Sequence, residues 1–237
     1  MTASPDAAPA RRRWRRAASH PLAHLAAAVL VIALVQSFAV KVYQVPSASM
    51  EQTLMPGDRI LVDRLGIAGP PSRGDVVVFE RPESWRDAPR GEKSPWRAAA
   101  GWFGDVFGFG PSNGDALVKR IVAGPGETVA CCDAVGRLTI DDEPLDEPYV
   151  THDLPFESGV LDCDTAPRSS RCFPPIHLGS DEYLLLGDSR ANSADSLAAC
   201  RGGASADTAS CARPVDREQI IGEAFFRFWP VTRWGMP

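Results

Sequence analysis

The chain has 237 residues, of which 44% are hydrophobic and 23% charged, and these averages exclude a disordered, collagen-like or coiled-coil protein. The charges are unevenly distributed. Five arginines precede residue 20, whereas residues 41–237 carry 20 basic and 29 acidic side chains, a formal charge of −9. Such an acidic body is repelled by phosphate groups, so we expect no nucleic-acid partner.

An uncharged segment follows the arginines. Residues 17–40 contain no Asp, Glu, Lys or Arg, and a helix of that length spans about 36 Å, more than the hydrocarbon core of about 30 Å. We therefore predict a basic cytoplasmic tail over residues 1–20, a single transmembrane anchor over residues 21–40 in the cytoplasmic membrane, and an extracytoplasmic domain over residues 41–237. The alternative is a cleavable secretory signal that ends at Ser37-Phe38-Ala39 and exports the same domain.

The exported part is predicted to be mainly β, with an inserted lobe. Helical periodicity is scarce there, and short runs rich in Val, Ile and Leu recur between Gly, Pro and Asp. These runs predict strands over residues 59–62, 75–79, 116–122, 138–140, 183–186 and 220–229. Three stretches rich in Pro, Gly, Ser or Cys are predicted insertions: residues 81–115, 151–178 and 198–214.

Two serines follow the apolar segment closely. Ser47 and Ser49 lie in a Pro-Ser-Ala-Ser segment, which would stand at the membrane surface if the anchor is retained. A turn is the plainer interpretation of such a segment, because serine and proline are common in turns.

Adjacent cations interrupt an apolar run at Lys119 and Arg120. Alternate residues of a strand share a face, so one of the two cations must point along an apolar face. Burial favours the neutral amine of a lysine, and lowering its pKa from about 10.4 to 7–8 takes about 4 kcal/mol of differential desolvation. A neutral lysine beside a serine can act as a general base. The alternative is that both cations reach water.

Six cysteines agree with export: Cys131, Cys132, Cys163, Cys172, Cys200 and Cys211. An even number in an exported domain indicates disulfides. The spacing favours local bridges between Cys163 and Cys172 and between Cys200 and Cys211. The remaining doublet forms either a vicinal bridge or the ends of two different bridges.

Metal and Ser/His/Asp sites fit the sequence poorly. No CxxC pair exists, and His152 and His177 have no ligand-like spacing, which argues against zinc. The same two histidines lie in predicted insertions with no nucleophile motif nearby, and His20 and His24 flank the apolar segment. We expect no metal and no cofactor.

The last polar segment of interest, residues 185–196, runs from an apolar strand into a loop of small hydrogen-bonding side chains. Such side chains commonly stabilise a tight turn. Four blocks of the chain, the last of them in this loop, resemble bacterial type I signal peptidases in sequence and order. They are PSASMEQTL (46–54), GDRILVDRL (57–65), RGDVVVF (73–79) with LVKRIVAGPGETV (117–129), and GDSRANSADS (187–196).

The resemblance implies a membrane-bound serine endopeptidase with a signal-peptidase-like fold. Such enzymes cleave signal peptides from exported preproteins after small residues, often Ala-x-Ala, without a cofactor. It also implies that the substrate binds as an extended strand between residues 44–47 and 116–119.

The resemblance also assigns roles to individual residues. Ser49 matches the nucleophile and Lys119 the general base. Ser47 matches the side chain that donates to the oxyanion, and Ser193 matches the serine that hydrogen-bonds and orients the lysine. Further matches are the structural residues Asp188, Arg190 and Asp195 and the pocket residues Val45, Met50, Leu54 and Val118.

The sequence departs from the family pattern at four positions. Gln52 stands where the family usually has Pro, and Ser189, Ala191 and Leu197 replace the usual Asn, Asp and Arg of the last block. The joint loss of Asp and Arg removes the residues of one salt bridge. None of the four replaces Ser49 or Lys119.

Residues 94–110 are rich in Trp and Phe and match nothing in the family pattern. We hypothesise that they dip into the outer leaflet, with burial of the rings in the core as the alternative. Two other functions also fit the chain as a whole: a catalytically idle, anchored, disulfide-bonded binding or structural domain, and a specialised self-cleaving Ser/Lys protease.

Overall fold

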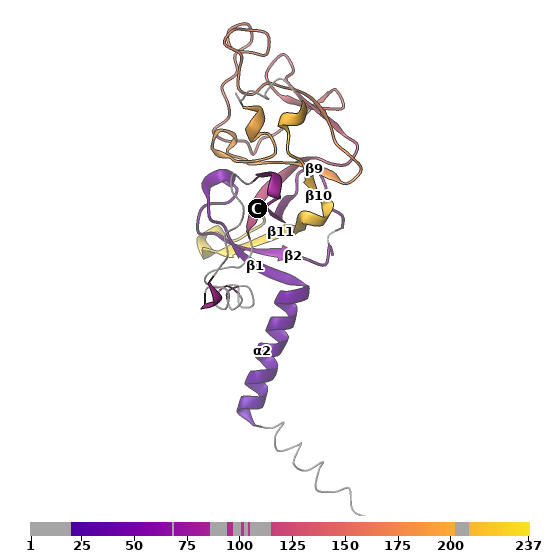
Figure 1. Ribbon diagram of the computed structural model, residues 1–237. Helices are drawn as coiled ribbons and strands as arrows, with labels where there is room; N and C mark the ends of the chain where they lie inside the picture. The colour runs from indigo at the N-terminus through magenta and orange to yellow at the C-terminus, as the bar shows by residue number, and fades with distance from the viewer. Residues whose placement is uncertain are drawn as a thin grey trace, which may run out of the picture.

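The computed structural model describes residues 20–67, 69–85, 94–96, 101, 104, 115–201 and 209–237. The predicted tail at residues 1–19, and most of the aromatic stretch at residues 94–110, lie outside these ranges. Within the described part, one α-helix precedes two antiparallel sheets and several short 3₁₀ helices (Figure 1). The chain is mainly β, as predicted.

Helix α2 (Pro21–Phe38) begins at His20, whose side chain accepts a hydrogen bond from the backbone N–H of Leu22. Figure 1 shows the helix extending away from the sheets, with its C-terminal end leading into β1. Nine large apolar side chains along it are exposed: Leu22, Leu25, Val29, Leu30, Val31, Ile32, Leu34, Val35 and Phe38. Among the described residues, no helix meets the length and hydropathy of a membrane span, so the predicted anchor is not confirmed.

The last two residues of the predicted anchor segment, 39 and 40, lie outside the helix. The helix ends at Phe38, and Val40 already pairs with Asp63 in the first strand pair. Apolar character alone does not distinguish the end of a buried or membrane helix from the start of a strand.

The larger sheet has seven strands in the described part of the chain, in the order β1-β2-β11-β3-β4-β9-β10. Its strands are β1 (Val40–Gln44), β2 (Arg59–Asp63), β3 (Val76–Glu80), β4 (Ala116–Ala123), β9 (Glu182–Leu186), β10 (Val215–Asp216) and β11 (Ile220–Trp229). All neighbours are antiparallel. Strand β4 therefore lies between β3 and β9, and the sheet brings together three segments that are distant in the sequence.

The smaller sheet has the order β7-β6-β5-β8 within the described residues. It contains β5 (Thr128–Cys131), β6 (Leu138–Ile140), β7 (Glu143–Pro144) and β8 (Phe173–His177). It belongs to the lobe drawn at the end of the molecule opposite α2 (Figure 1). Strand β8 lies inside the predicted insertion 151–178, where Pro174 and Pro175 concealed the strand pattern.

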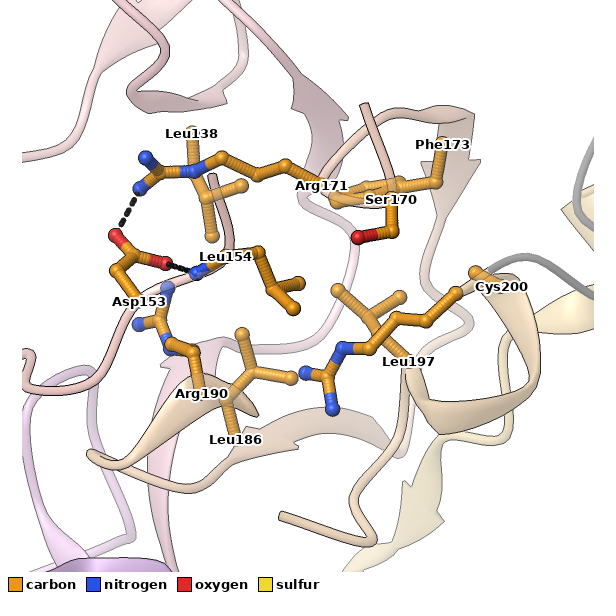
Figure 2. Close-up of a pocket in the computed structure, with 11 residues that line it drawn as sticks. Leu138, Asp153, Leu154, Ser170, Arg171, Phe173, Leu186, Arg190, Leu197 and Cys200 are labelled. Carbon is orange, nitrogen blue, oxygen red and sulfur yellow. Dashed lines mark hydrogen bonds and ion pairs between the residues drawn. The ribbon is translucent and has the colours of Figure 1, made fainter. Parts of the chain in front are cut away.

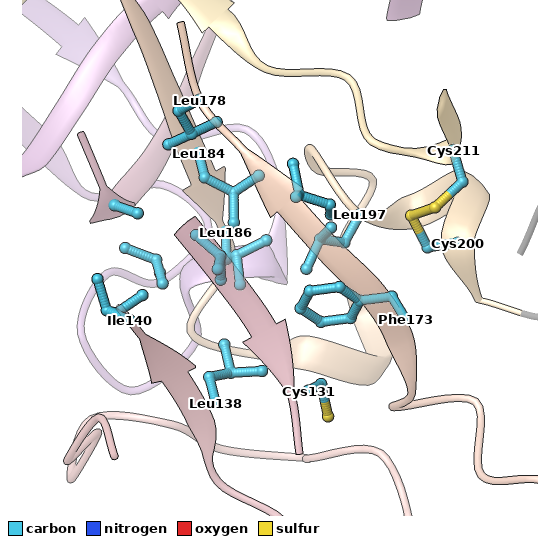
Figure 3. Packing of buried hydrophobic residues seen from close by; sticks show 14 residues of the cluster. Cys131, Leu138, Ile140, Phe173, Leu178, Leu184, Leu186, Leu197, Cys200 and Cys211 are labelled. Atoms are coloured by element: carbon cyan, nitrogen blue, oxygen red, sulfur yellow. A yellow bond between two sulfur atoms is a disulfide. The ribbon is translucent and has the colours of Figure 1, made fainter. Parts of the chain in front are cut away.

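The two sheets share one apolar core. Figure 3 shows Leu184 and Leu186 of β9 packed with Leu138 of β6 and Phe173 of β8, beside the disulfide between Cys200 and Cys211. Bridges also join Cys163 to Cys172 and Cys131 to Cys132. The two local bridges predicted from spacing are therefore present, and the doublet forms the vicinal bridge.

Candidate active site

Ser49 lies in the 3₁₀ helix η1 (Ala48–Met50), in the connection between β1 and β2. Beneath it, Met50, Val45 and Leu54 belong to one buried cluster and are at most 2% exposed. This apolar floor fixes the turn and leaves the Ser49 hydroxyl directed at the groove above.

Lys119 reaches Ser49 from β4. Its Nζ lies 2.5 Å from the Oγ of Ser49, although the two residues are 70 positions apart in the chain. Lys119 is 3% exposed and pairs in register with Val77 of β3. The strand therefore delivers the amine to the serine from the middle of the sheet.

The surroundings of Lys119 favour its neutral form. Burial lowers its pKa from 10.5 to about 8, while the carboxylates of Asp195 and Asp188 oppose that shift and the guanidinium groups of Arg201 and Arg81 add to it. Desolvation is the largest of these effects. The pKa of Lys119 therefore lies much closer to neutral pH than that of an exposed lysine.

Arg120 points to the opposite side of β4 and is also buried. Its Nε and Nη2 donate to the two carboxylate oxygens of Asp188 at 2.9 and 2.8 Å, and its Nη1 donates to the carbonyl of Gly74 at 2.7 Å. The guanidinium also lies 4.1 Å from the ring centroid of Tyr149. The alternative in which both cations reach water is wrong, because each finds buried partners.

A groove with a volume of about 610 Å³ opens over Ser49 and Lys119. Its walls are Pro46, Ser47, Arg81, Trp85, Leu117, Ala191, Asn192, Ser193, Ala194 and Ala198. The residues predicted to line substrate pockets, Val45, Met50, Leu54 and Val118, lie instead in the buried cluster beneath Ser49. Strand alternation identifies Leu117, which shares a face with Lys119, as the groove residue in place of Val118.

The two predicted supporting serines both lie at the groove. The hydroxyl of Ser47 is 3.4 Å from that of Ser49. Ser193 is buried, but its Oγ has no hydrogen-bond partner among the described residues, so the predicted bond to Lys119 is absent. In this arrangement the lysine amine is directed at Ser49 instead.

The last block of the resemblance is bonded to the backbone of Ser49. The backbone N–H of Ser189 donates to the carbonyl of Ser49 at 3.1 Å. Arg190 forms a buried ion pair with Glu147, and Asp195 accepts from the backbone N–H groups of Gly187 and Leu197 at 3.2 and 3.1 Å. The three predicted structural residues therefore have buried partners, and Glu147 is a partner that the sequence did not indicate.

A smaller cavity of about 20 Å³ lies between this block and the lobe (Figure 2). Figure 2 shows Leu186, Leu197 and Phe173 along it, with Arg171 paired to Asp153 at 2.6 Å on one side. This volume holds about one water molecule and is too small for a peptide.

Four cysteine sulfurs lie within 4.8 Å of one another in the described residues, at Cys131, Cys132, Cys163 and Cys172. Cysteine binds a metal as the thiolate, and all four of these sulfurs are in disulfides. This set of residues therefore does not present a metal site in its oxidised form.

A serine hydroxyl against a buried lysine amine, facing an open groove, is the arrangement of hydrolases that use a serine nucleophile and a lysine base. The family model described as "Signal peptidase, peptidase S26" matches residues 19–229. The chain belongs to this family. It is therefore a serine peptidase, of the class that processes signal peptides.

Relatives agree with this membership. Signal peptidase I of Mycobacterium tuberculosis is 35% identical over 88% of this chain and 71% of its own length. Signal peptidase IB of Staphylococcus aureus is 26% identical over 89% of this chain and 88% of its own. A crystal structure of a signal peptidase I from Enterococcus faecalis matches 65% of this chain and 95% of its own chain at 19% identity, with a TM-score of 0.32.

Proposed function

We propose that this chain is a membrane-anchored endopeptidase that cleaves signal peptides from exported preproteins with Ser49 as nucleophile and Lys119 as general base. The observation that carries the proposal is the 2.5 Å separation of their reactive atoms at a lysine that is 3% exposed. The family membership supports the substrate class.

The geometry supports the following course of reaction. Neutral Lys119 takes the proton of the Ser49 hydroxyl as the oxygen attacks the scissile carbonyl. The oxyanion then accepts hydrogen bonds from the Ser47 hydroxyl and the backbone N–H of Ser49. Lys119 returns the proton to the leaving amine. Lys119 then deprotonates a water molecule that attacks the acyl-enzyme, and it gives this proton to the Ser49 oxygen as the acid product leaves.

The groove suits an extended peptide. It runs between Pro46 and Ser47 on one side and Leu117 and Lys119 on the other, and a substrate strand there extends the sheet. Its far wall consists largely of small side chains, those of Ala191, Ala194 and Ala198. We propose that a substrate strand in this groove lies close to the backbone of the enzyme, and that this closeness causes the preference for small residues of the Ala-x-Ala type before the scissile bond.

Helix α2 is the proposed anchor. Its 18 residues extend about 27 Å, close to the hydrocarbon core of about 30 Å, and its exposed face is apolar. Five arginines precede it, which favours a cytoplasmic N-terminus and places the catalytic domain outside. With β1 following directly, Ser49 stands near the membrane surface, where a signal peptide emerges.

The test uses full-length, detergent-solubilised protein and a preprotein with an Ala-x-Ala site. Wild type should cleave after the second small residue, and Ser49→Ala and Lys119→Ala should each lose at least about 10³-fold in kcat. Ser180→Ala, which removes an exposed hydroxyl from the connection between β8 and β9, is the matched control. Cleavage that persists in either variant excludes the dyad, and a wild type without activity favours a binding domain.

A further inference from the structure

Arg201 contacts both Asp195 and the backbone of Ser193, and the sequence assigned it no role. Its Nη2 donates to Oδ2 of Asp195 at 3.0 Å and lies 2.9 Å from Oδ1, and its Nη1 donates to the carbonyl of Ser193 at 2.8 Å. The guanidinium thus holds both a buried carboxylate and the backbone of a groove residue. Arg201 lies in the predicted insertion 198–214, outside every block of the family resemblance.

Asp195 needs this partner. The carboxylate is 2% exposed and accepts from Gly187 and Leu197, which close the two ends of one loop. A buried carboxylate without a cation is strongly disfavoured. Leu197 stands where the family pattern has Arg, and its side chain is instead 4% exposed in the apolar core (Figure 3). The charge therefore comes from one turn further along the chain.

A disulfide holds Arg201 in place. Cys200, directly before it, is bonded to Cys211, and the two cysteines are 2% and 1% exposed. Between Asp195 and Arg201 the chain follows tight turns, in which the backbone N–H of Ala198 donates to the carbonyl of Asp195 and that of Cys200 to the carbonyl of Leu197. The Cα of Arg201 is therefore tied to the core independently of its ion pair.

The pair acts on the proposed general base. Asp188 and Asp195 raise the pKa of Lys119, and Arg201 and Arg81 lower it. Arg201 therefore offsets the carboxylate that it binds. Removing its charge leaves Asp195 to stabilise the protonated amine, while the Ser193 carbonyl loses its donor.

We propose that Arg201 is a positioning residue for the Ser49–Lys119 site, as the cationic partner of the buried Asp195, and that the disulfide between Cys200 and Cys211 holds it there. The effect on turnover rests on the proposed function of Ser49 and Lys119. The site is thereby sensitive to the redox state of one bridge: a dithiol reductant that converts this bridge to two thiols, and is itself oxidised to a disulfide, frees the turn that carries Arg201.

The first experiment compares Arg201→Gln and Arg201→Lys with wild type in preprotein cleavage across pH. Arg201→Gln should lower kcat at pH 7 by about tenfold, the equivalent of one charged hydrogen bond, with KM little changed and the pH midpoint moved upward. Arg201→Lys should recover most of the pH midpoint, because it retains the charge. Arg137→Gln breaks an exposed ion pair with Asp133 in the lobe and is the matched control.

The second experiment tests the bridge. Cys200→Ser with Cys211→Ser should lower kcat and raise the pH midpoint in the manner of Arg201→Gln, whereas Cys163→Ser with Cys172→Ser should do neither. Combining Arg201→Gln with the first pair should add little further loss, because both changes act on one contact. Fully additive losses, or a profile of Arg201→Gln equal to that of wild type, overturn the inference.

A third measurement needs no activity. In the Ser49→Ala background, the rate of Lys119 acylation by a small anhydride, followed against pH by mass spectrometry, reports the protonation of the amine directly. Adding Arg201→Gln should move that titration to higher pH, and an unchanged titration contradicts the proposal. Absence of cleavage by wild type would refute the proposed function and leave this result to decide the role of Arg201.

Discussion

Arg120 and Asp188 form a two-point ion pair in the interior, one residue along β4 from Lys119. The pair joins the strand that carries the amine to the loop whose Ser189 bonds to the carbonyl of Ser49. Two adjacent cations of one strand therefore serve opposite faces, one at the groove and one inside the protein.

Removing the charge of Asp188 should destabilise the fold. Asp188→Asn leaves the buried guanidinium of Arg120 without its carboxylate, and we expect the free energy of unfolding in urea to fall by about 3 kcal/mol. Arg137→Gln, at an exposed pair, should cost less than about 1 kcal/mol. If the free energy of unfolding fell equally in the two variants, burial of the ion pair would not increase its contribution to stability.

Activity should rise with pH through the pKa of Lys119. The base acts only when neutral, so kcat/KM should increase up to a plateau with a midpoint near 8. A profile that falls over this range would mean that the protonated form is the active one. Initial rates in constant-ionic-strength buffers from pH 6 to about 10 measure it.

The same titration should appear in stability. Lys119 has a pKa of about 8 when folded and 10.5 when exposed, so between these values the unfolded chain binds more protons and the free energy of unfolding rises with pH. The gain is about 3 kcal/mol by linkage. Lys119→Met should lack this component, and urea titrations of both proteins at pH 8 and 10.5 give the difference.

Gly187 should not tolerate a side chain. A Cβ there would lie 2.3 Å from Oγ of Ser193 and 2.6 Å from the carbonyl of Ser49, so Gly187→Ala must displace one wall of the groove. We expect kcat to fall by at least about tenfold and stability by about 1–3 kcal/mol. Gly124→Ala, whose nearest neighbour would be at 3.8 Å, is the control and should change neither quantity appreciably.

The apolar surface of α2 should determine membrane association. Val29→Arg together with Leu30→Arg places two charges in the middle of the helix, at a cost of about 2.5–3.5 kcal/mol each in a bilayer. Most of the protein should then move to the carbonate-soluble fraction. Val135→Arg with Val160→Arg, at exposed positions of the lobe, should remain membrane-bound, and a similar release of both pairs would contradict the proposed anchor.

Local sequence patterns predicted part of the fold. All six predicted strands occur, because β-branched runs between Gly, Pro and Asp favour half-buried extended backbone. The bridges of Cys163 and Cys200 to their near neighbours were predictable for the same reason. Five strands of the described residues were not predicted: β1, β5, β7, β8 and β10. In β8 two prolines contradict the pattern, and only its pairing with β5 makes it a strand.

By itself, the sequence determined the candidates for the reactive side chains: the alternation of β4 required one of two adjacent cations to face apolar residues, and the family blocks singled out Ser49 and Lys119. Only the tertiary structure decided their surroundings. It buried Val118 beneath the groove, exposed Leu117 to it, paired Arg120 with Asp188 and paired Arg201 with Asp195. These relations join segments distant in sequence, and burial and electrostatic pairing act through distances in space, which spacing along the chain does not contain.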